Sequence, residues 1–414
     1  MRESAVPGGA SRRQPAREPA ARTYARALPV VPVRARGLTI EGADGRRYLD
    51  CVSGAGTLAL GHNHPVVLEA IRAVLDSGAP LHVMDLTTPV EDAFVTELLR
   101  TLPPGLAAHA RVRFCGPTGT DPVATAVSLV RAATGRSRVI AVSDAPEPLP
   151  GDGGAERDRP AALLLEPVRS EAGVLPVADA LVRRLRSRTA GQGVPLVVDE
   201  TETGVGRTGA YWAFEHSGVT PDVLILDKAV GGSLPLAAVV HRDDLDDSGD
   251  PGGEGTVGVP AAAHTGATGA GAFRGNQLAL AAGAATLAHV REQRLAEHAA
   301  ALGDRMLTRL RALAGEFACV GDVRGRGLMA GVELVSPDGT AAELAAAVRR
   351  ECLHRGLIVD VTGPRANVVR LLPPLIVTEE QMSAVLDRLF DAVRAVDRHR
   401  VGGPAALRGE HAPR

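Results

Sequence analysis

The chain has 414 residues, and at about 150 residues per domain this length predicts two or three lobes. Its 46 basic and 48 acidic residues give a formal net charge of −2, so the composition offers no basis for attraction to nucleic acid or to an anionic membrane. No apolar run reaches about 18 residues, and the arginine-rich start lacks the apolar stretch of a secretory signal. We therefore expect a cytoplasmic protein without nucleic-acid or membrane partners.

The first sixty residues divide into a tail and a group of strands. Residues 1–22 are rich in Arg, Pro, Ala and Gly without periodic apolar residues, which predicts a disordered tail. Residues 29–52 read as short strands joined by an Asp-Gly turn. His62 and His64 follow in the segment Gly-His-Asn-His-Pro. We interpret this pair as structural, and because the four cysteines are scattered, no metal site is expected.

Most of the remaining chain alternates between short aliphatic runs and segments with helical periodicity. The aliphatic runs predict strands at 111–116, 138–142, 161–168, 195–200, 222–228 and 236–241. Apolar residues at helical spacing predict helices at 64–78, 89–102, about 121–134 and about 276–315. Continuous Val, Ile and Leu runs are typical of strands buried on both faces, so we predict an α/β fold with a mainly parallel sheet.

Toward the C-terminus the pattern changes. Residues 242–272 are acidic and then rich in Gly and Ala, which predicts a long loop, and residues 320–395 read as strand, helix, strand and helix. These changes suggest boundaries for a disordered tail (1–22), the N-terminal part of a small domain (23–60), a large domain (61–315), the C-terminal part of the small domain (316–398) and a second tail (399–414).

One residue type carries more information than the rest of the composition. Lys228 is the only lysine among the 46 basic residues, and arginine cannot replace a lysine that must lose its proton and attack a carbonyl group. Lys228 and Asp199 both stand at the carboxyl ends of predicted strands, where α/β sheets bind ligands. The turn Gly-Pro-Thr-Gly-Thr at 116–120 precedes a helix and offers backbone N–H groups to a phosphate. Together these features predict a pocket for pyridoxal phosphate, with no metal.

The segment DETETGVGRTGAYWAFEHSGVTPDVLILDKAVGGSLPLAAVV, at 199–240, resembles the signature of the class III, ornithine-type pyridoxal-phosphate aminotransferases. Further matches are GHNHP (61–65), GPTGT (116–120), EPVRSEAGVLP (166–176), FRGNQLA (273–279), VRGRGLMAGVEL (323–334) and VVRLLPPL (368–375). The segment LHVMDLTTPVEDAF, at 81–94, is most similar to diaminobutyrate–2-oxoglutarate transaminases. The resemblance implies the type I pyridoxal-phosphate-dependent transferase fold, with a large α/β domain and a small α+β domain built from both chain ends. It also implies a homodimer.

Carried over residue by residue, the resemblance implies a set of groups that bind the cofactor. Lys228 would form the Schiff base and move the substrate proton, and Asp199 would keep the pyridine nitrogen protonated. Gly119 and Thr120 would hold the phosphate. Glu202 would lie beside the phenolic oxygen of the cofactor.

For the substrate, the resemblance implies two further residues. Arg370 would receive the substrate carboxylate, and Glu171 would pair with Arg370 so that the site accepts two differently charged substrates. An ordinary surface ion pair is the alternative reading of Arg370 and Glu171. The implied reaction is amino transfer between a diamino or ω-amino acid, such as diaminobutyrate, and a 2-oxo acid such as 2-oxoglutarate.

Three departures from the family pattern leave other functions open. An aromatic-His-Gly segment and several dozen residues around it are missing after 138–142. Glu202 stands where the family usually has Gln, and Ala272 stands where it usually has a phosphate-binding Thr. One alternative is a pyridoxal-phosphate enzyme repurposed for elimination, replacement or cyclisation on an amino acid. Another is a non-catalytic homologue that acts as a partner subunit.

Overall fold

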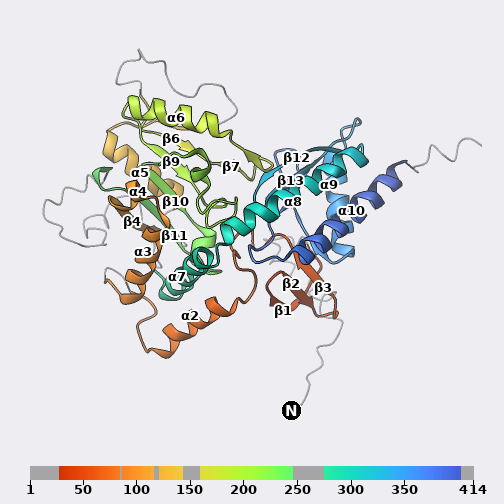
Figure 1. The fold of residues 1–414 in the computed structure, drawn as a ribbon, viewed down its shortest axis with the longest axis horizontal. Coiled ribbons are helices and arrows are strands. Elements are labelled where there is room, and N and C mark those ends of the chain that lie inside the picture. Colours follow the sequence, from red (N-terminus) through yellow and green to blue (C-terminus); the bar gives the residue numbers. More distant parts are fainter. Residues whose placement is uncertain (1–27, 84–85, 116–120, 143–158, 246–274, 402–414) are drawn as a thin grey trace, which may run out of the picture.

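The computed structural model describes residues 28–83, 86–115, 121–142, 159–245 and 275–401, and the predictions for the tails and for most of the 242–272 loop lie outside these residues. The chain forms two units that lie side by side (Figure 1). One is built around a six-stranded sheet, and the other contains the C-terminal strands together with the N-terminal ones.

The six-stranded sheet has the order β4-β11-β10-β9-β6-β5. Its strands are β4 (Ala110–Cys115), β5 (Val139–Ala141), β6 (Ala162–Leu165), β9 (Leu196–Asp199), β10 (Val223–Leu226) and β11 (Ala237–Arg242). The helices around it are α2 (Pro65–Asp76), α3 (Pro89–Thr101), α4 (Pro104–Ala107), α5 (Pro122–Thr134), α6 (Asp179–Gly191) and α7 (Gln277–Glu292). Strands β10, β9, β6 and β5 pair in parallel, while β11 pairs antiparallel with both β10 and β4. The prediction of a mainly parallel sheet in an α/β fold is therefore confirmed.

Short elements complete the large unit. They are the hairpin of β7 (Val168–Arg169) and β8 (Leu175–Pro176), and the 3₁₀ helices η2 (Ala213–Ser217), η3 (Lys228–Gly231) and η4 (Asp243–Leu245).

The central strands are buried on both faces. Their side chains point alternately to the two sides of the sheet, and a packed core lies on each side. Val197 of β9 and Ile225 of β10 share a core with Leu129 of α5. The residues directly before them in the same strands, Leu196 and Leu224, belong to the larger core that includes residues of α3 and α7. This two-sided burial explains the continuous aliphatic runs in the sequence.

The second unit combines both ends of the chain. Its C-terminal part consists of β12 (Val320–Arg326), β13 (Met329–Leu334), α9 (Ala341–His354), β14 (Leu357–Ile358), β15 (Asp360–Thr362), β16 (Val368–Leu371) and α10 (Glu379–Val401). Its N-terminal strands are β1 (Pro32–Arg36), β2 (Thr39–Gly42) and β3 (Arg47–Asp50). The sheets have the orders β12-β13-β16-β15 and β1-β2-β3-β14, and β14 pairs in parallel with β3. A small α+β unit from both chain ends is thus confirmed, whereas the domain boundaries stay a prediction.

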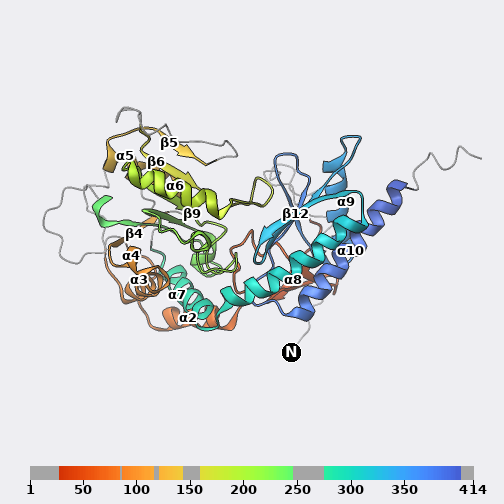
Figure 2. The same cartoon turned by 45° about the horizontal axis from the view of Figure 1, so that its top comes forward.

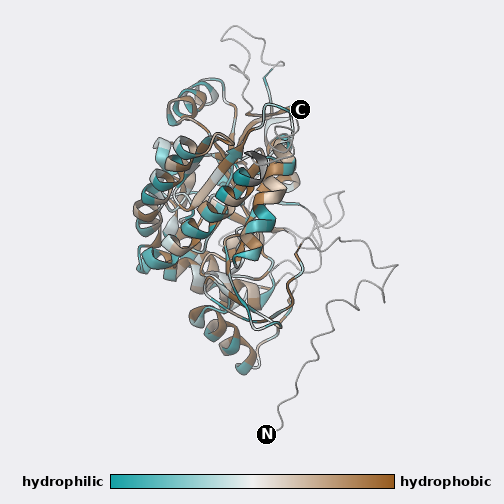
Figure 3. Ribbon diagram, turned by 90° about the vertical axis from the view of Figure 1, so that its right-hand side faces the viewer, coloured by the Kyte–Doolittle hydropathy of each residue, from teal (hydrophilic) through white to brown (hydrophobic). Residues whose placement is uncertain are grey.

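The reading of 320–395 as strand, helix, strand and helix was too simple, because two strands, β12 and β13, precede α9 and three short strands, β14, β15 and β16, lie between α9 and α10. Helix α8 (Leu295–Glu316) follows α7 after a break at Arg294, whose φ is +54°, and runs from the large unit to the small one (Figure 2). The outer helices carry both polar and apolar residues along their ribbons (Figure 3). Among the described residues, no helix is both long enough and apolar enough to cross a membrane.

The turn that carries Lys228 is seated directly on helix α7. Gly232 follows η3 with φ +55°, and a Cβ atom there would lie 2.3 Å from the carbonyl oxygen of Ala282. A Cβ atom on Gly283 would lie 2.2 Å from the carbonyl oxygen of Val230. Both glycines are therefore required by the close approach of the two backbones.

Replacing Gly283 with Ala is expected to lower the free energy of unfolding by about 1–3 kcal/mol, because the backbone of η3 must move away from α7. Urea denaturation would measure the loss. Gly315→Ala is the matched control: it also changes a helical glycine, but its Cβ would meet nothing within 4 Å. The control should be neutral or slightly stabilising. Equal effects of the two substitutions would contradict the packing argument.

Candidate active site

Asp199 and Lys228 lie at the same edge of the large sheet. Asp199 is the last residue of β9 and pairs in register with Ile225 of β10, while Lys228 begins η3 just beyond β10. The backbone N–H of Lys228 donates a 2.6 Å hydrogen bond to the carboxylate of Asp227. Lys228 has φ +54°, a left-handed conformation that costs energy for a residue with a side chain and is typical of functional positions.

Asp199 is a carboxyl group that lacks a cationic partner among the described residues. Its Oδ1 accepts a 2.9 Å hydrogen bond from the backbone N–H of Thr201, which favours the charged form. Burial has the larger effect and raises the pKa of Asp199, with the negative charge of Glu202 adding to it. A protonated ring nitrogen would supply the missing positive charge. Asp199 and the amine of Lys228 therefore fit pyridoxal phosphate.

Glu202 lies between two cations. Its Oε1 accepts a short hydrogen bond from Nζ of Lys228, and its Oε2 lies 3.3 Å from Nη1 of Arg370. The Glu202 side chain is only 11% exposed. The carboxylate of Glu202 is thus neutralised by Lys228 and Arg370.

Arg370 is surrounded by acceptors. Nη1 donates to Ser170 Oγ and to Glu171 Oε1, both at 2.8 Å, and Nη2 donates to Asp360 at 2.6 Å. Asp360 of β15 is the cross-strand partner of Arg370 on β16, so the sheet register places this carboxylate beside the guanidinium.

The charge of Arg370 is stabilised by these acids. Its side chain is 3% exposed, and Nε has no hydrogen-bond partner in the described part of the chain. Burial alone would lower the pKa of Arg370, but the charge of Glu202 and the hydrogen bonds to Asp360 and Glu171 raise it above its usual value.

The structure brings together four of the sequence-predicted residues. Lys228, Glu202, Arg370 and Glu171 form one connected cluster of hydrogen bonds and ion pairs, with Asp199 on the neighbouring strand. Sequence reasoning missed Ser170 and Asp360. Ser170 stands directly before Glu171 in the matched segment, whereas Asp360 becomes visible only through the strand register.

Three residues named from the sequence fall where the structure gives no description. Gly119, Thr120 and Ala272 lie outside the described residues, as does most of the segment that replaces the missing aromatic-His-Gly block. Nε2 of His62 lies 2.8 Å from Oδ2 of Asp50. The part of the chain that is described has no group of three or more His, Cys, Asp or Glu residues able to hold a metal ion.

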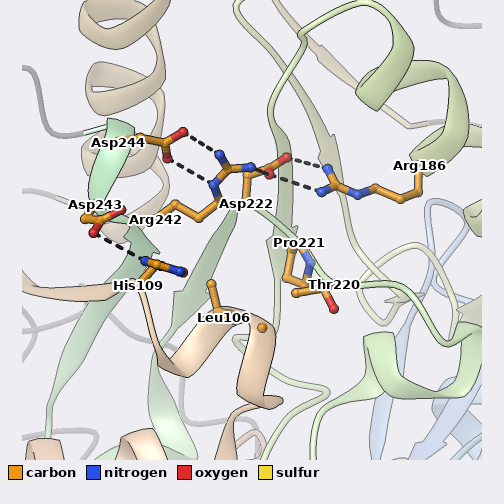
Figure 4. Close-up of a pocket in the computed structure, with 10 residues that line it drawn as sticks. Leu106, His109, Arg186, Thr220, Pro221, Asp222, Arg242, Asp243 and Asp244 are labelled. Atoms are coloured by element: carbon orange, nitrogen blue, oxygen red, sulfur yellow. Dashed lines mark hydrogen bonds and ion pairs between the residues drawn. The ribbon is translucent and has the colours of Figure 1, made fainter.

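A cavity of about 430 Å³ lies at the opposite edge of the sheet, where β10 begins and β11 ends (Figure 4). At its wall, Asp222 accepts hydrogen bonds from Arg186 and Arg242, at 2.5 and 3.0 Å, and from the backbone N–H of Leu196 at 2.8 Å. These contacts tie α6, β9 and β11 together. We therefore interpret Asp222 and its two arginines as structural.

Glu200 is a second buried carboxyl group next to the site. It is 2% exposed, and its oxygens accept hydrogen bonds from Phe214 N at 2.9 Å and from Thr203 Oγ1 at 2.5 Å. Burial outweighs these donors and raises the pKa of Glu200 to about 7.

A sequence profile described as Aminotransferase class-III matches residues 20–145 and 154–393. A diaminobutyrate–2-oxoglutarate aminotransferase of Rhizobium meliloti (strain 1021) is 40% identical, with 93% of this chain and 92% of the relative covered. The corresponding protein of Haemophilus influenzae is 35% identical, with 92% and 94% covered. The first alignment spans 450 positions, more than the 414 residues here, so the relative contains residues that this chain lacks.

Solved structures agree on the fold. The acetylornithine aminotransferase of Elizabethkingia anophelis has a TM-score of 0.76 at 25% identity, covering 93% of this chain and 99% of that one. The ornithine aminotransferase of Toxoplasma gondii ME49 has a TM-score of 0.79 at 24% identity, covering 95% and 97%. Another Toxoplasma gondii structure is described as having partial occupancy of pyridoxal phosphate at its active site. The expected type I fold is confirmed.

The raised pKa of Glu200 predicts a pH-dependent stability. The folded protein holds the Glu200 proton more tightly than the unfolded chain, whose carboxyl has the ordinary value of 4.5. The free energy of unfolding should therefore fall as pH rises from about 4.5 to about 7, by up to about 1.4 kcal/mol per unit. Glu200→Gln should lack this component in urea denaturation at several pH values. The exposed control Glu69→Gln should keep the wild-type dependence, and identical slopes for all three proteins would refute the assignment.

Proposed function

The chain belongs to the class III aminotransferases, and on that premise we propose that it moves an amino group between 2,4-diaminobutyrate and 2-oxoglutarate. The observation that carries the proposal is the Lys228–Glu202–Arg370 cluster, which joins an amine to a buried carboxylate receptor at the strand edge beside Asp199. Relatives at 40% and 35% identity bear this activity in their names. The repurposed enzyme and the non-catalytic partner are not favoured, because the relatives are aminotransferases.

The protein is a pyridoxal-phosphate-dependent enzyme. When bound, pyridoxal phosphate supplies an aldehyde that takes up amino groups and a ring that withdraws electrons from the substrate carbon. In our proposal Lys228 attaches the cofactor and, when free, moves a proton with its Nζ. Asp199 keeps the ring nitrogen protonated, while Gly119 and Thr120 hold the phosphate. The role of Asp199 is supported by its partly buried position and by its lack of a cationic partner among the described residues.

Arg370 and Glu171 are proposed to handle the second functional group of each substrate. A buried guanidinium can bind a carboxylate of 2-oxoglutarate through two parallel hydrogen bonds. Glu171 contacts the same Nη1 atom, yet its side chain is 73% exposed, so it can move into solvent when a carboxylate arrives. When Glu171 pairs with Arg370, it neutralises the positive charge of Arg370, which would otherwise repel the second amino group of the diamino substrate.

We also propose a cytoplasmic homodimer. The four cysteines are free and buried, which suits a compartment that keeps thiols reduced. Exposed leucines at positions 75, 81 and 86, on and after α2, are apolar side chains that a subunit interface would cover.

Lys228→Ala is expected to abolish both the visible absorption of pyridoxal phosphate attached to the protein and the formation of glutamate from diaminobutyrate and 2-oxoglutarate. The reason is that no other lysine is present in the chain. Lys228→Arg is the control for the ion pair, because it keeps a cation beside Glu202 but cannot attach the cofactor. It should be as inactive as the alanine variant. Full turnover by either variant would exclude Lys228 as the attachment site.

Arg370→Lys is expected to raise the KM for 2-oxoglutarate about tenfold or more, because a lysine keeps the charge but loses the two-pronged hydrogen bond. Steady-state kinetics with each substrate varied in turn would measure the change. Arg326→Lys is the matched control, since Arg326 makes a two-pronged contact to Asp179, at 2.9 and 3.2 Å, outside the cluster. The proposal fails if the KM for 2-oxoglutarate is unchanged in a folded Arg370→Lys variant.

A further inference from the structure

We infer that Glu202 is an electrostatic link between Lys228 and Arg370, so that a carboxylate that binds Arg370 changes the ion pair of Lys228. The inference rests on the proposed function, because it takes Arg370 as the receptor of a substrate carboxylate. A glutamine at position 202 would have no charge to share between the two cations.

The link is built from one carboxylate. Oε1 of Glu202 accepts from Lys228, and Oε2 lies 3.3 Å from Nη1 of Arg370. Glu202 is 11% exposed, so water screens these contacts little. A change of charge at one cation is therefore felt by the oxygen atoms that face the other.

The three acids around Arg370 differ in how they are held. Glu171 is 73% exposed. Asp360 is anchored, because its Oδ1 also accepts from the backbone N–H of Val361 at 2.8 Å. Within the described residues, Glu202 is the one acid of the three that also contacts Lys228. Glu171 is therefore a movable counter-ion of Arg370, Asp360 is a fixed one, and Glu202 is shared with Lys228.

The donor Nη1 has more acceptors than hydrogens. A guanidinium Nη atom carries two hydrogens, yet Ser170, Glu171 and Glu202 all lie within hydrogen-bond distance of Nη1. The contact to Glu202, at 3.3 Å, is the longest of the three. A carboxylate that arrives at Nη1 is therefore expected to displace Glu202 as well as Glu171, which leaves Glu202 to Lys228 alone.

In this arrangement the electrostatic interaction between Lys228 and Glu202 depends on whether Arg370 has bound a carboxylate. With Arg370 unoccupied by substrate, Glu202 is shared between two cations. With a carboxylate at Arg370, Glu202 neutralises only the free ammonium of Lys228. The substrate that carries the second carboxylate thus changes the electrostatic environment of the amine that moves the proton.

The single lysine makes the link directly measurable. In the full-length chain, labelled with ¹³C,¹⁵N-lysine and prepared without pyridoxal phosphate, Lys228 gives the only lysine side-chain NMR signal. Glutarate, a dicarboxylate with neither an amino nor an oxo group, is the probe. Titration should shift the Lys228 signal with saturation, while calorimetry on the same sample reports binding. Thermal unfolding of each sample verifies that it is folded.

Two substitutions separate the link from general effects. In Glu202→Gln, glutarate should bind about fivefold more tightly, because a competing anion is gone, yet the Lys228 signal should not move. Asp360→Asn is the matched control: it also removes a carboxylate from Arg370 but none from Lys228, so the shift should persist. If Glu202→Gln does not fold, Glu202→Asp provides the second test, because its shorter side chain cannot reach both cations and should reduce the shift.

The possible failures are distinguishable. If glutarate does not bind the wild-type chain, the proposed role of Arg370 in substrate binding is wrong. If glutarate binds and the Lys228 signal stays in place, or if the signal shifts equally in Glu202→Gln, the link is refuted while the proposed function stands.

Discussion

The buried guanidinium of Arg370 needs negative charge around it, and that need connects parts of the chain that are far apart. Taking a charged group out of water costs several kcal/mol unless partners compensate it. The partners come from the residues beside β7, from the turn after β9 and from β15. Because Arg370 itself is on β16, these contacts fix the small unit against the carboxyl edge of the large sheet. The candidate site lies where the two units meet.

The two edges of the large sheet use opposite arrangements of charge. At the amino edge, one acid, Asp222, pairs with Arg186 of α6 and with Arg242 of β11, and Arg242 also pairs with Asp244. At the carboxyl edge, one arginine is surrounded by three acids, one of them largely in solvent. The ion pairs of Asp222 join α6 to β11, whereas the most exposed acid around Arg370, Glu171, is 73% exposed. The buried central charge is thus negative at the amino edge and positive at the carboxyl edge.

Much of the large unit was predictable because its central strands are buried on both faces and leave continuous aliphatic runs. The lone lysine and Asp199 could be placed at the ends of such runs. The contact between Arg370 and Asp360 could not, because it depends on the register of strands only three or four residues long. The left-handed conformation of Lys228 also leaves no local signal, since such positions usually hold glycine. The position of Glu202 between two cations required both units to be in place.

The parallel pairing of β14 with β3 has a consequence for how the chain is made. Leu49, near the start, lies opposite Leu357, near the end, so a growing chain exposes β1–β3 long before their partner leaves the ribosome. The large sheet can assemble meanwhile from strands that are closer in sequence. Arg370 is synthesised still later, so its cluster with Glu171, Glu202 and Asp360 cannot assemble before β16 has been made. Truncated or stalled chains can therefore carry Lys228 on a formed sheet and still lack half of the site.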